Sequence, residues 1–176
     1  MDISYKQRTL KVVVYLLLTA ATALIQNTAG LTLEIGGARC FILLPVCMIL
    51  GAGEDERFAA VIALAGGMLW DLSSSVHLGF NAVYMCIMCF FGAALITYII
   101  RNTFITNFIF STVFILIYCL LYWLFFIIIK DVRGAELSLF TFYLPSALYT
   151  IIATPVIYFS LKPVKRSLNK PIRALN

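Results

Sequence analysis

The stretch FITNFIFSTVFILIYCLLYWLFFIII, residues 104–129, decides the class of this chain. Its 26 residues carry no charged side chain. A helix of roughly 20 apolar residues is long enough to cross the hydrocarbon core of a bilayer. Over all 176 residues, 62% are hydrophobic and 12% are charged, and the mean hydropathy is +1.00. A soluble domain of this size could not cover itself with so little polar surface, so we predict an integral membrane protein.

Apolar stretches on both sides of residues 104–129 extend this prediction to the whole chain. They are separated by short polar connections that leave no room for a domain outside the membrane. We therefore predict a single all-α, polytopic domain over residues 1–176, ending in a basic cytoplasmic tail at 162–176. The six predicted transmembrane helices cover about 10–29, 38–53, 58–76, 80–100, 104–129 and 139–161.

The distribution of basic residues predicts the orientation. With six helices, ten of the 13 Lys and Arg residues fall on the side of the two termini, and Arg39, Lys130 and Arg133 fall on the other. Cytoplasmic loops are enriched in Lys and Arg, so both termini are predicted to be cytoplasmic in the cell membrane. The formal net charge of +5 therefore indicates contact of the tail with anionic membrane lipids, and not binding of nucleic acid.

The third predicted helix is interrupted by GGMLWDLSSSVHLGFN, residues 66–81. If that helix starts at Phe58, Asp71 lies about 20 Å along it, still within the membrane. Gly79 allows the positive φ that a sharp turn back into the membrane requires. Asp71 then has three interpretations: it caps free backbone amides of the turn, it marks a docking face for a partner protein, or it handles an ion or substrate.

The other reactive side chains do not form a catalytic or metal-binding pattern. His77 has no second ligand at metal-binding spacing, and Ser73, Ser74 and Ser75 have no neighbouring base to activate them. All five cysteines lie in apolar runs, where cysteine behaves as a small hydrophobic residue. We therefore expect no enzyme activity, no metal and no cofactor.

Small residues predict where helices pack closely. Gly66 and Gly67 follow Ala65 in the third helix, one turn before Asp71. Small side chains let membrane helices approach each other. The last helix has a similar possible packing face, and its partner could be this chain or another protein; the face comprises Pro145, Ser146, Tyr149, Thr150 and Ala153.

Several of these residues form a pattern that resembles a known family. Gly67-x-x-x-Asp71, Asp71-Leu72-x-Ser74 and Leu78-Gly79 are similar to the signature of the bacterial rod-shape-determining protein MreD family. Gln26 at the end of the first helix, the stretch YLPSALY at 143–149 and the basic tail also agree with that family.

The resemblance implies a fold and a function. Members of the family are non-catalytic membrane subunits of the cell-wall elongation complex, which control cell shape and peptidoglycan synthesis. They bind MreC and, through it, work with MreB and with the elongation glycosyltransferase and transpeptidase. Their fold is similar to the substrate-binding subunits of energy-coupling-factor transporters. The matching positions here are Gly67, Asp71, Ser74 and Gly79, and His77 lies in the same predicted docking motif.

A second function class is a vitamin-binding subunit of an energy-coupling-factor type transporter. In that case Asp71, His77 and Asn81 would line a pocket open to the outside. Asp71 is the one acidic residue inside the predicted spans, and polar residues do not cluster on several helices. The scaffold function is therefore the preferred prediction.

Overall fold

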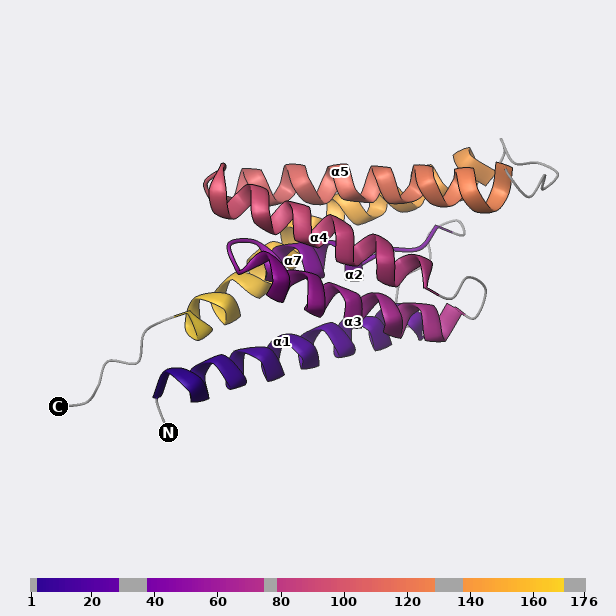
Figure 1. Cartoon of the computed structure of the whole chain (residues 1–176). Coiled ribbons are helices and arrows are strands. Elements are labelled where there is room, and N and C mark those ends of the chain that lie inside the picture. Colours follow the sequence, from indigo (N-terminus) through magenta and orange to yellow (C-terminus); the bar gives the residue numbers. More distant parts are fainter. Residues whose placement is uncertain (1–2, 29–37, 75–78, 129–137, 170–176) are drawn as a thin grey trace.

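The computed structural model describes residues 3–28, 38–74, 79–128 and 138–169 (Figure 1). Every regular element in these ranges is a helix, which confirms the predicted all-α class. The elements are α1 (Ile3–Asn27), α2 (Leu43–Gly51), α3 (Glu56–Ser74), α4 (Phe80–Tyr98), α5 (Phe104–Trp123), the π-helical turns η1 (Leu124–Ile128) and η2 (Leu139–Tyr143), and α7 (Leu144–Leu168).

Within these ranges, four helical stretches are long and apolar enough to cross a membrane. They are Arg8–Asn27, Phe80–Tyr98, Phe104–Ile128 and Leu139–Leu168. The predicted spans 38–53 and 58–76 correspond to α2 and α3, which do not belong to this set. α2 has only nine residues, and α3 carries Glu56, Arg57 and Asp71.

The second predicted helix differs most from its prediction, because only Leu43–Gly51 is α-helical. Pro45 explains where this helix starts. Proline has no N–H and its ring clashes with the carbonyl four residues earlier, so it fits best in the first turn of a helix and elsewhere kinks or interrupts it. Pro45 thus disfavours a helix that continues back through Phe41, and residues 38–42 approach α2 as irregular backbone. Its end is fixed by Ala52, with ψ of 118°, and by Gly53, with φ of +73°.

The two ends of the chain also differ from their predicted bounds. α1 begins at Ile3, before the predicted residue 10, and α7 continues to Leu168. Residues 162–168 of the predicted basic tail are therefore helical. The remaining tail residues 170–176 lie outside the described part.

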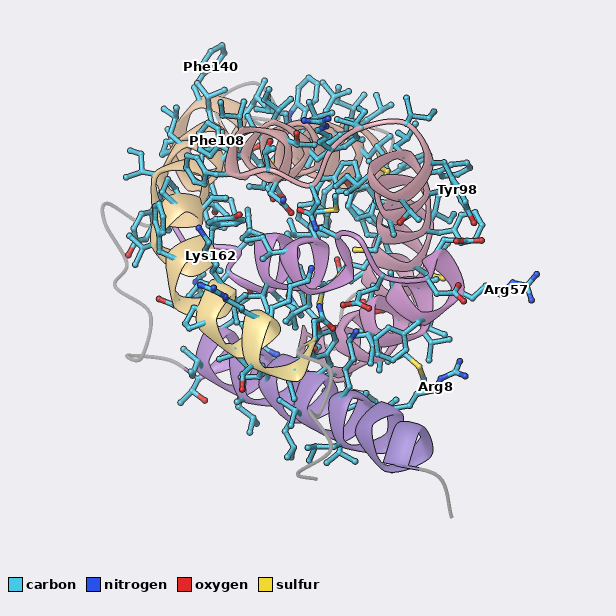
Figure 2. All side chains as sticks on the ribbon, turned by 90° about the vertical axis from the view of Figure 1, so that its left-hand side faces the viewer. Arg8, Arg57, Tyr98, Phe108, Phe140 and Lys162 are labelled. Atoms are coloured by element: carbon cyan, nitrogen blue, oxygen red, sulfur yellow. The ribbon has the colours of Figure 1, made fainter. Side chains whose placement is uncertain are left out.

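α2 lies at the centre of the molecule, and all nine of its residues are buried. Seen from the end where α1 begins and α7 ends, the other five helices surround it (Figure 2). Successive segments run in alternating directions along the long axis, so both described chain ends reach the same end of the bundle (Figure 1). We call this the termini end and the opposite one the far end.

The irregular segment before α2 is held by side chains of α1 and α7. The N–H of Arg39 donates to Ser146 Oγ at 3.0 Å, and the N–H of Phe41 donates to Thr150 Oγ1 at 2.9 Å. The N–H of Leu43 donates to Gln26 Oε1 at 2.8 Å. Non-helical backbone at membrane depth requires such partners, because lipid cannot hydrogen-bond to it.

The predicted packing face of the last helix, α7, therefore packs within this chain, against the segment before α2. Ser146 and Thr150 are fully buried, and Ala147 and Thr154 are buried with them. Pro145, Tyr149 and Ala153, predicted for the same face, are only half-buried. Buried residues thus recur every four positions along α7. The hydroxyl groups of Ser146 and Thr150 accept hydrogen bonds from the backbone before α2.

The carbonyl groups at the C-terminal end of α2 accept hydrogen bonds from side chains of α7 and of the α4–α5 connection. Lys165 Nζ donates to the carbonyl of Ile49 at 2.7 Å and to that of Ala52. Asn102 Nδ2 also donates to Ala52 O, at 2.9 Å. The last carbonyls of a helix lack partners inside the helix and carry partial negative charge, so a buried ammonium group stabilises them.

Lys165→Met should therefore destabilise the fold, because it keeps the apolar length but removes the side-chain donor of the Ile49 carbonyl and one of the two side-chain donors of the Ala52 carbonyl. We expect a loss of about 2 kcal/mol, seen as a thermal midpoint lower by roughly 5 °C. The measurement is thermal unfolding in detergent, followed by size-exclusion chromatography. Arg57→Met is the control, since the exposed Arg57 side chain points away from the bundle (Figure 2). An equal change in both variants would contradict the capping role of Lys165.

Candidate functional site

The site predicted around Asp71 is a tight hairpin between α3 and α4. The Asp71 side chain is 3% exposed and faces the first turn of α4. Its Oδ2 accepts hydrogen bonds from the N–H of Gly79 at 3.1 Å and of Ala82 at 3.0 Å. Its Oδ1 accepts one from the N–H of Asn81 at 3.2 Å. The carboxylate thus satisfies backbone donors at the start of α4.

The local sequence explains why the start of α4 needs an acceptor from Asp71, eight residues before its N-cap. The N-cap residue of α4 is Gly79, which has φ of +95° and no side chain to accept from the first amides. Helix N-termini favour an acceptor with negative charge, because their N–H groups are unpaired and the helix dipole is positive there. Asp71, which belongs to α3 and lies eight residues before the cap, supplies this negatively charged acceptor.

Gly67 allows α3 and α4 to approach closely enough for this contact. A Cβ atom at Gly67 would lie 2.5 Å from Ala82 Cα and 2.7 Å from both Ala82 N and Asn81 O. These are backbone atoms, which cannot move aside as a flexible side chain can. Gly67 and Asp71 therefore act on the same turn of α4 from successive turns of α3.

The structure brings three of the five predicted motif residues together. Gly67, Asp71 and Gly79 meet at the start of α4. Ser74 is the last residue of α3, and its side chain lies outside the described part, as does the whole of His77. The geometry agrees with the capping interpretation: among the described residues, the capped amides are those of Gly79, at the end of the turn, and of Asn81 and Ala82 in α4.

A cavity of about 270 Å³ opens beside this hairpin, towards the far end. Aromatic side chains form much of its wall. The rings of Trp70 and Tyr118 are tilted to each other with centroids 5.3 Å apart, and the ring centroid of Phe41 lies 5.5 Å from that of Tyr118. The full lining is Gln26, Asn27, Arg39, Cys40, Phe41, Trp70, Ser73, Asn81, Tyr118, Tyr122, Phe142 and Tyr143.

Polar groups in the cavity come from helices far apart in the sequence. Asn81 Oδ1 accepts from Tyr118 Oη at 2.8 Å. Gln26 accepts from Leu43 through Oε1, but its buried Nε2 has no hydrogen-bond partner among the described residues. A ligand with an acceptor atom and a flat apolar body would suit such a cavity. Asp71, predicted to line this kind of pocket, does not belong to its lining.

The sequence interpretation missed the inward direction of Tyr118. Tyr118 is 3% exposed and packs in the core. The signal was the spacing of Ser111, Ile115 and Tyr118, which places these residues on one face of a helix. All three are buried.

The cysteines form no reactive group in the described part of the chain. All five are free, and four of them are buried. Within the same ranges, no three His, Cys, Asp or Glu side chains gather where they could hold a metal ion.

Fold and site together define an all-helical protein with four membrane-length helices, a buried central helix and an aspartate-capped hairpin. No protein-family model, no curated protein and no solved structure matches this chain.

Proposed function

We propose that this protein is a non-catalytic scaffold of the bacterial cell-wall elongation complex, similar to MreD, that binds MreC in the cell membrane. The observation that carries the proposal is the motif at 67–79. Its glycines and aspartate have connected structural roles, since Gly67 permits the contact that Asp71 makes with α4. A shared motif of this kind reflects a shared hairpin, and not a shared reaction.

Six membrane crossings are part of the proposal, and chain length supports them. The nine residues of α2 extend about 14 Å as a helix, and residues 38–41, before the turn at Ile42, can add roughly 13 Å in extended form. Together they reach about 27 Å, close to the thickness of a hydrocarbon core. The common position of both chain ends in Figure 1 agrees with an even number of crossings, and the basic residues favour the cytoplasm for that end. A fold similar to energy-coupling-factor substrate-binding subunits belongs to the same proposal.

A non-catalytic role is supported by what Asp71 does. Its carboxylate accepts from the N–H groups of Gly79, Asn81 and Ala82, which leaves it poorly placed for proton transfer or transport. An ionisable group inside a membrane is by default a functional candidate. Here the buried amides of α4 provide a structural reason for its presence.

The surface that receives MreC differs from the one expected from the sequence. The small-residue faces of α3 and α7 are occupied within this chain. A Cβ atom at Gly66 would lie 2.7 Å from Thr19 Cγ2 and 3.2 Å from Cys47 Sγ, and Thr150 Oγ1 accepts from the N–H of Phe41. A partner's membrane helix must therefore pack on outward apolar side chains. One such row follows α7 at four-residue spacing, with Leu148, Ile152 and Val156 between 55% and 73% exposed.

Co-purification with MreC tests this function. We expect a tagged copy of this chain to recover MreC from detergent-solubilised membranes, and its depletion to round or widen rod-shaped cells. A bait with the same tag on an unrelated multi-pass protein is the control. A depleted strain of normal shape, together with no MreC in the purified sample, would contradict the proposal.

The far-end cavity favours one alternative, a small-molecule-binding subunit of an energy-coupling-factor type transporter. Its aromatic wall is a feature of ligand pockets, and so is the buried Nε2 of Gln26, which has no partner among the described residues. Mass spectrometry of the small molecules extracted from purified protein separates the two functions. A stoichiometric vitamin would favour the transporter subunit, whereas a sample containing lipid alone would favour the scaffold.

A further inference from the structure

A second cavity, of about 260 Å³, lies at the termini end between the start of α5 and the end of α7. Three cationic side chains line it, together with three amide side chains, and no acidic side chain belongs to the lining that the described residues provide. The six polar residues are Lys162, Lys165, Arg166, Asn102, Asn107 and Asn169. Such a composition favours an anionic ligand.

One carboxylate lies near these cations: Glu54 accepts from the lining residue Asn169 at 3.4 Å and acts electrostatically on Lys165. Glu54 is itself paired with Lys11, so the three cations of the lining outnumber it. Lys165 donates to two backbone carbonyls. Arg166 is exposed, and Lys162 lies 5.9 Å from the ring centre of Tyr158. Figure 2 shows Lys162 on α7, away from Arg8 and Arg57.

The side-chain oxygen of Asn107 in this cavity could accept a hydrogen bond from a ligand. The Nδ2 of Asn107 donates to Asn102 Oδ1 at 2.6 Å and to Thr103 O at 2.8 Å, which fixes the orientation of the amide. Its Oδ1 is buried and has no partner among the described residues. A buried acceptor without a donor is unfavourable, so a ligand hydroxyl group at this position would stabilise it.

The position of the cavity matches the level of lipid headgroups. Lys162, Lys165 and Arg166 lie near the end of α7, which is one of the four membrane-length helices. Lys and Arg bind phosphate through charge-assisted hydrogen bonds. Basic pockets between membrane helices on the cytoplasmic side bind anionic headgroups.

We propose that this cavity binds an anionic phosphodiester headgroup with a free hydroxyl group, such as that of phosphatidylglycerol. The phosphate lies among Lys162, Lys165 and Arg166, and the hydroxyl donates to Asn107 Oδ1. The site needs the membrane-length helices but is independent of MreC binding and of the far-end cavity.

Native mass spectrometry with added lipid tests the site. We expect the detergent-solubilised protein to retain phosphatidylglycerol in preference to phosphatidylcholine. The double variant Lys162→Gln/Arg166→Gln should weaken phosphatidylglycerol binding on the order of 30-fold, since each basic group near a membrane surface contributes about one kcal/mol. Both side chains are exposed, so its thermal midpoint should stay that of the wild type.

The matched control is Arg8→Gln/Arg57→Gln, which removes two exposed cations from the same end of the bundle. It should bind phosphatidylglycerol as the wild type does. Phosphatidylmethanol keeps the phosphodiester but lacks the hydroxyl, and should bind several-fold more weakly because one hydrogen bond is lost. Equal retention of phosphatidylcholine, or equal weakening in both double variants, would overturn the site.

A soluble headgroup identifies the source of the phosphate. Glycerophosphoglycerol is added to the protein with bound phosphatidylglycerol, and inorganic phosphate is added in a parallel sample. If neither displaces the lipid at millimolar concentration, the natural ligand is a phospholipid. Displacement by either that is lost in Lys162→Gln/Arg166→Gln also supports the site but assigns it to a free phosphate compound. Displacement that is unchanged in this variant would overturn it.

Discussion

Gly67→Ala is expected to destabilise the protein by about 3 kcal/mol or more, because its new methyl group would meet backbone and not side chains. The Cβ would lie 2.5 Å from Ala82 Cα, so α4 must move away from α3. That movement also lengthens the hydrogen bonds from Asp71 to Asn81 and Ala82. In detergent, we expect the thermal midpoint to fall by roughly 10 °C.

Gly92→Ala is the matched control for this change. Gly92 is also buried within a helix, and its Cβ would lie 2.7 Å from Met48 Cε and 2.9 Å from Phe114 Cζ. The methionine end is flexible and can shift, and alanine is favoured over glycine in a helix by about 1 kcal/mol. We expect Gly92→Ala to unfold several degrees above Gly67→Ala. Similar midpoints for the two variants would mean that the α3–α4 approach does not limit stability.

The interrupted third helix could be predicted from the sequence because its signals are local. Asp71 breaks an apolar run, and Gly79 permits a positive φ eight residues later. The predicted ends at 76 and 80 lie close to the observed ends at Ser74 and Phe80. The specific partners of Asp71 could not be predicted, because they depend on how far the hairpin closes.

The form of α2 could not be predicted from its own residues. Hydropathy alone makes 38–53 appear to be a full span, and nothing within it reveals that Ser146 and Thr150 of α7 hold its irregular start. These partners are more than 100 residues away in the sequence. Pro45 was the local signal, since proline disfavours helix in the residues that precede it.

Lys165 illustrates the same limit at the other end of α2. In the sequence it belongs to a basic tail that was expected to contact lipid. In the fold it reaches the carbonyls of Ile49 and Ala52, more than 110 residues earlier. A lysine that also caps a helix and a lysine that contacts lipid headgroups alone have the same local sequence pattern. They differ only in what the chain places opposite them.

Asp71→Ala is the second change with a large expected effect. It leaves the N–H groups of Gly79, Asn81 and Ala82 without their carboxylate acceptor, and Asn81 and Ala82 are buried. Each buried donor left unpaired costs about 1–3 kcal/mol, so we expect a total loss of about 3–5 kcal/mol. The measurement is again the thermal midpoint in detergent, together with the amount of protein recovered from membranes.

Asp71→Asn separates hydrogen bonding from charge. An amide oxygen placed where Oδ2 now lies can still accept from Gly79 and Ala82, whereas the amide nitrogen cannot accept from Asn81. We therefore expect a midpoint between those of Asp71→Ala and the wild type. If Asp71→Asn is as unstable as Asp71→Ala, the negative charge at the start of α4 is the decisive term. If Asp71→Ala keeps the wild-type midpoint but no longer recovers MreC, the aspartate acts in docking and the capping interpretation fails.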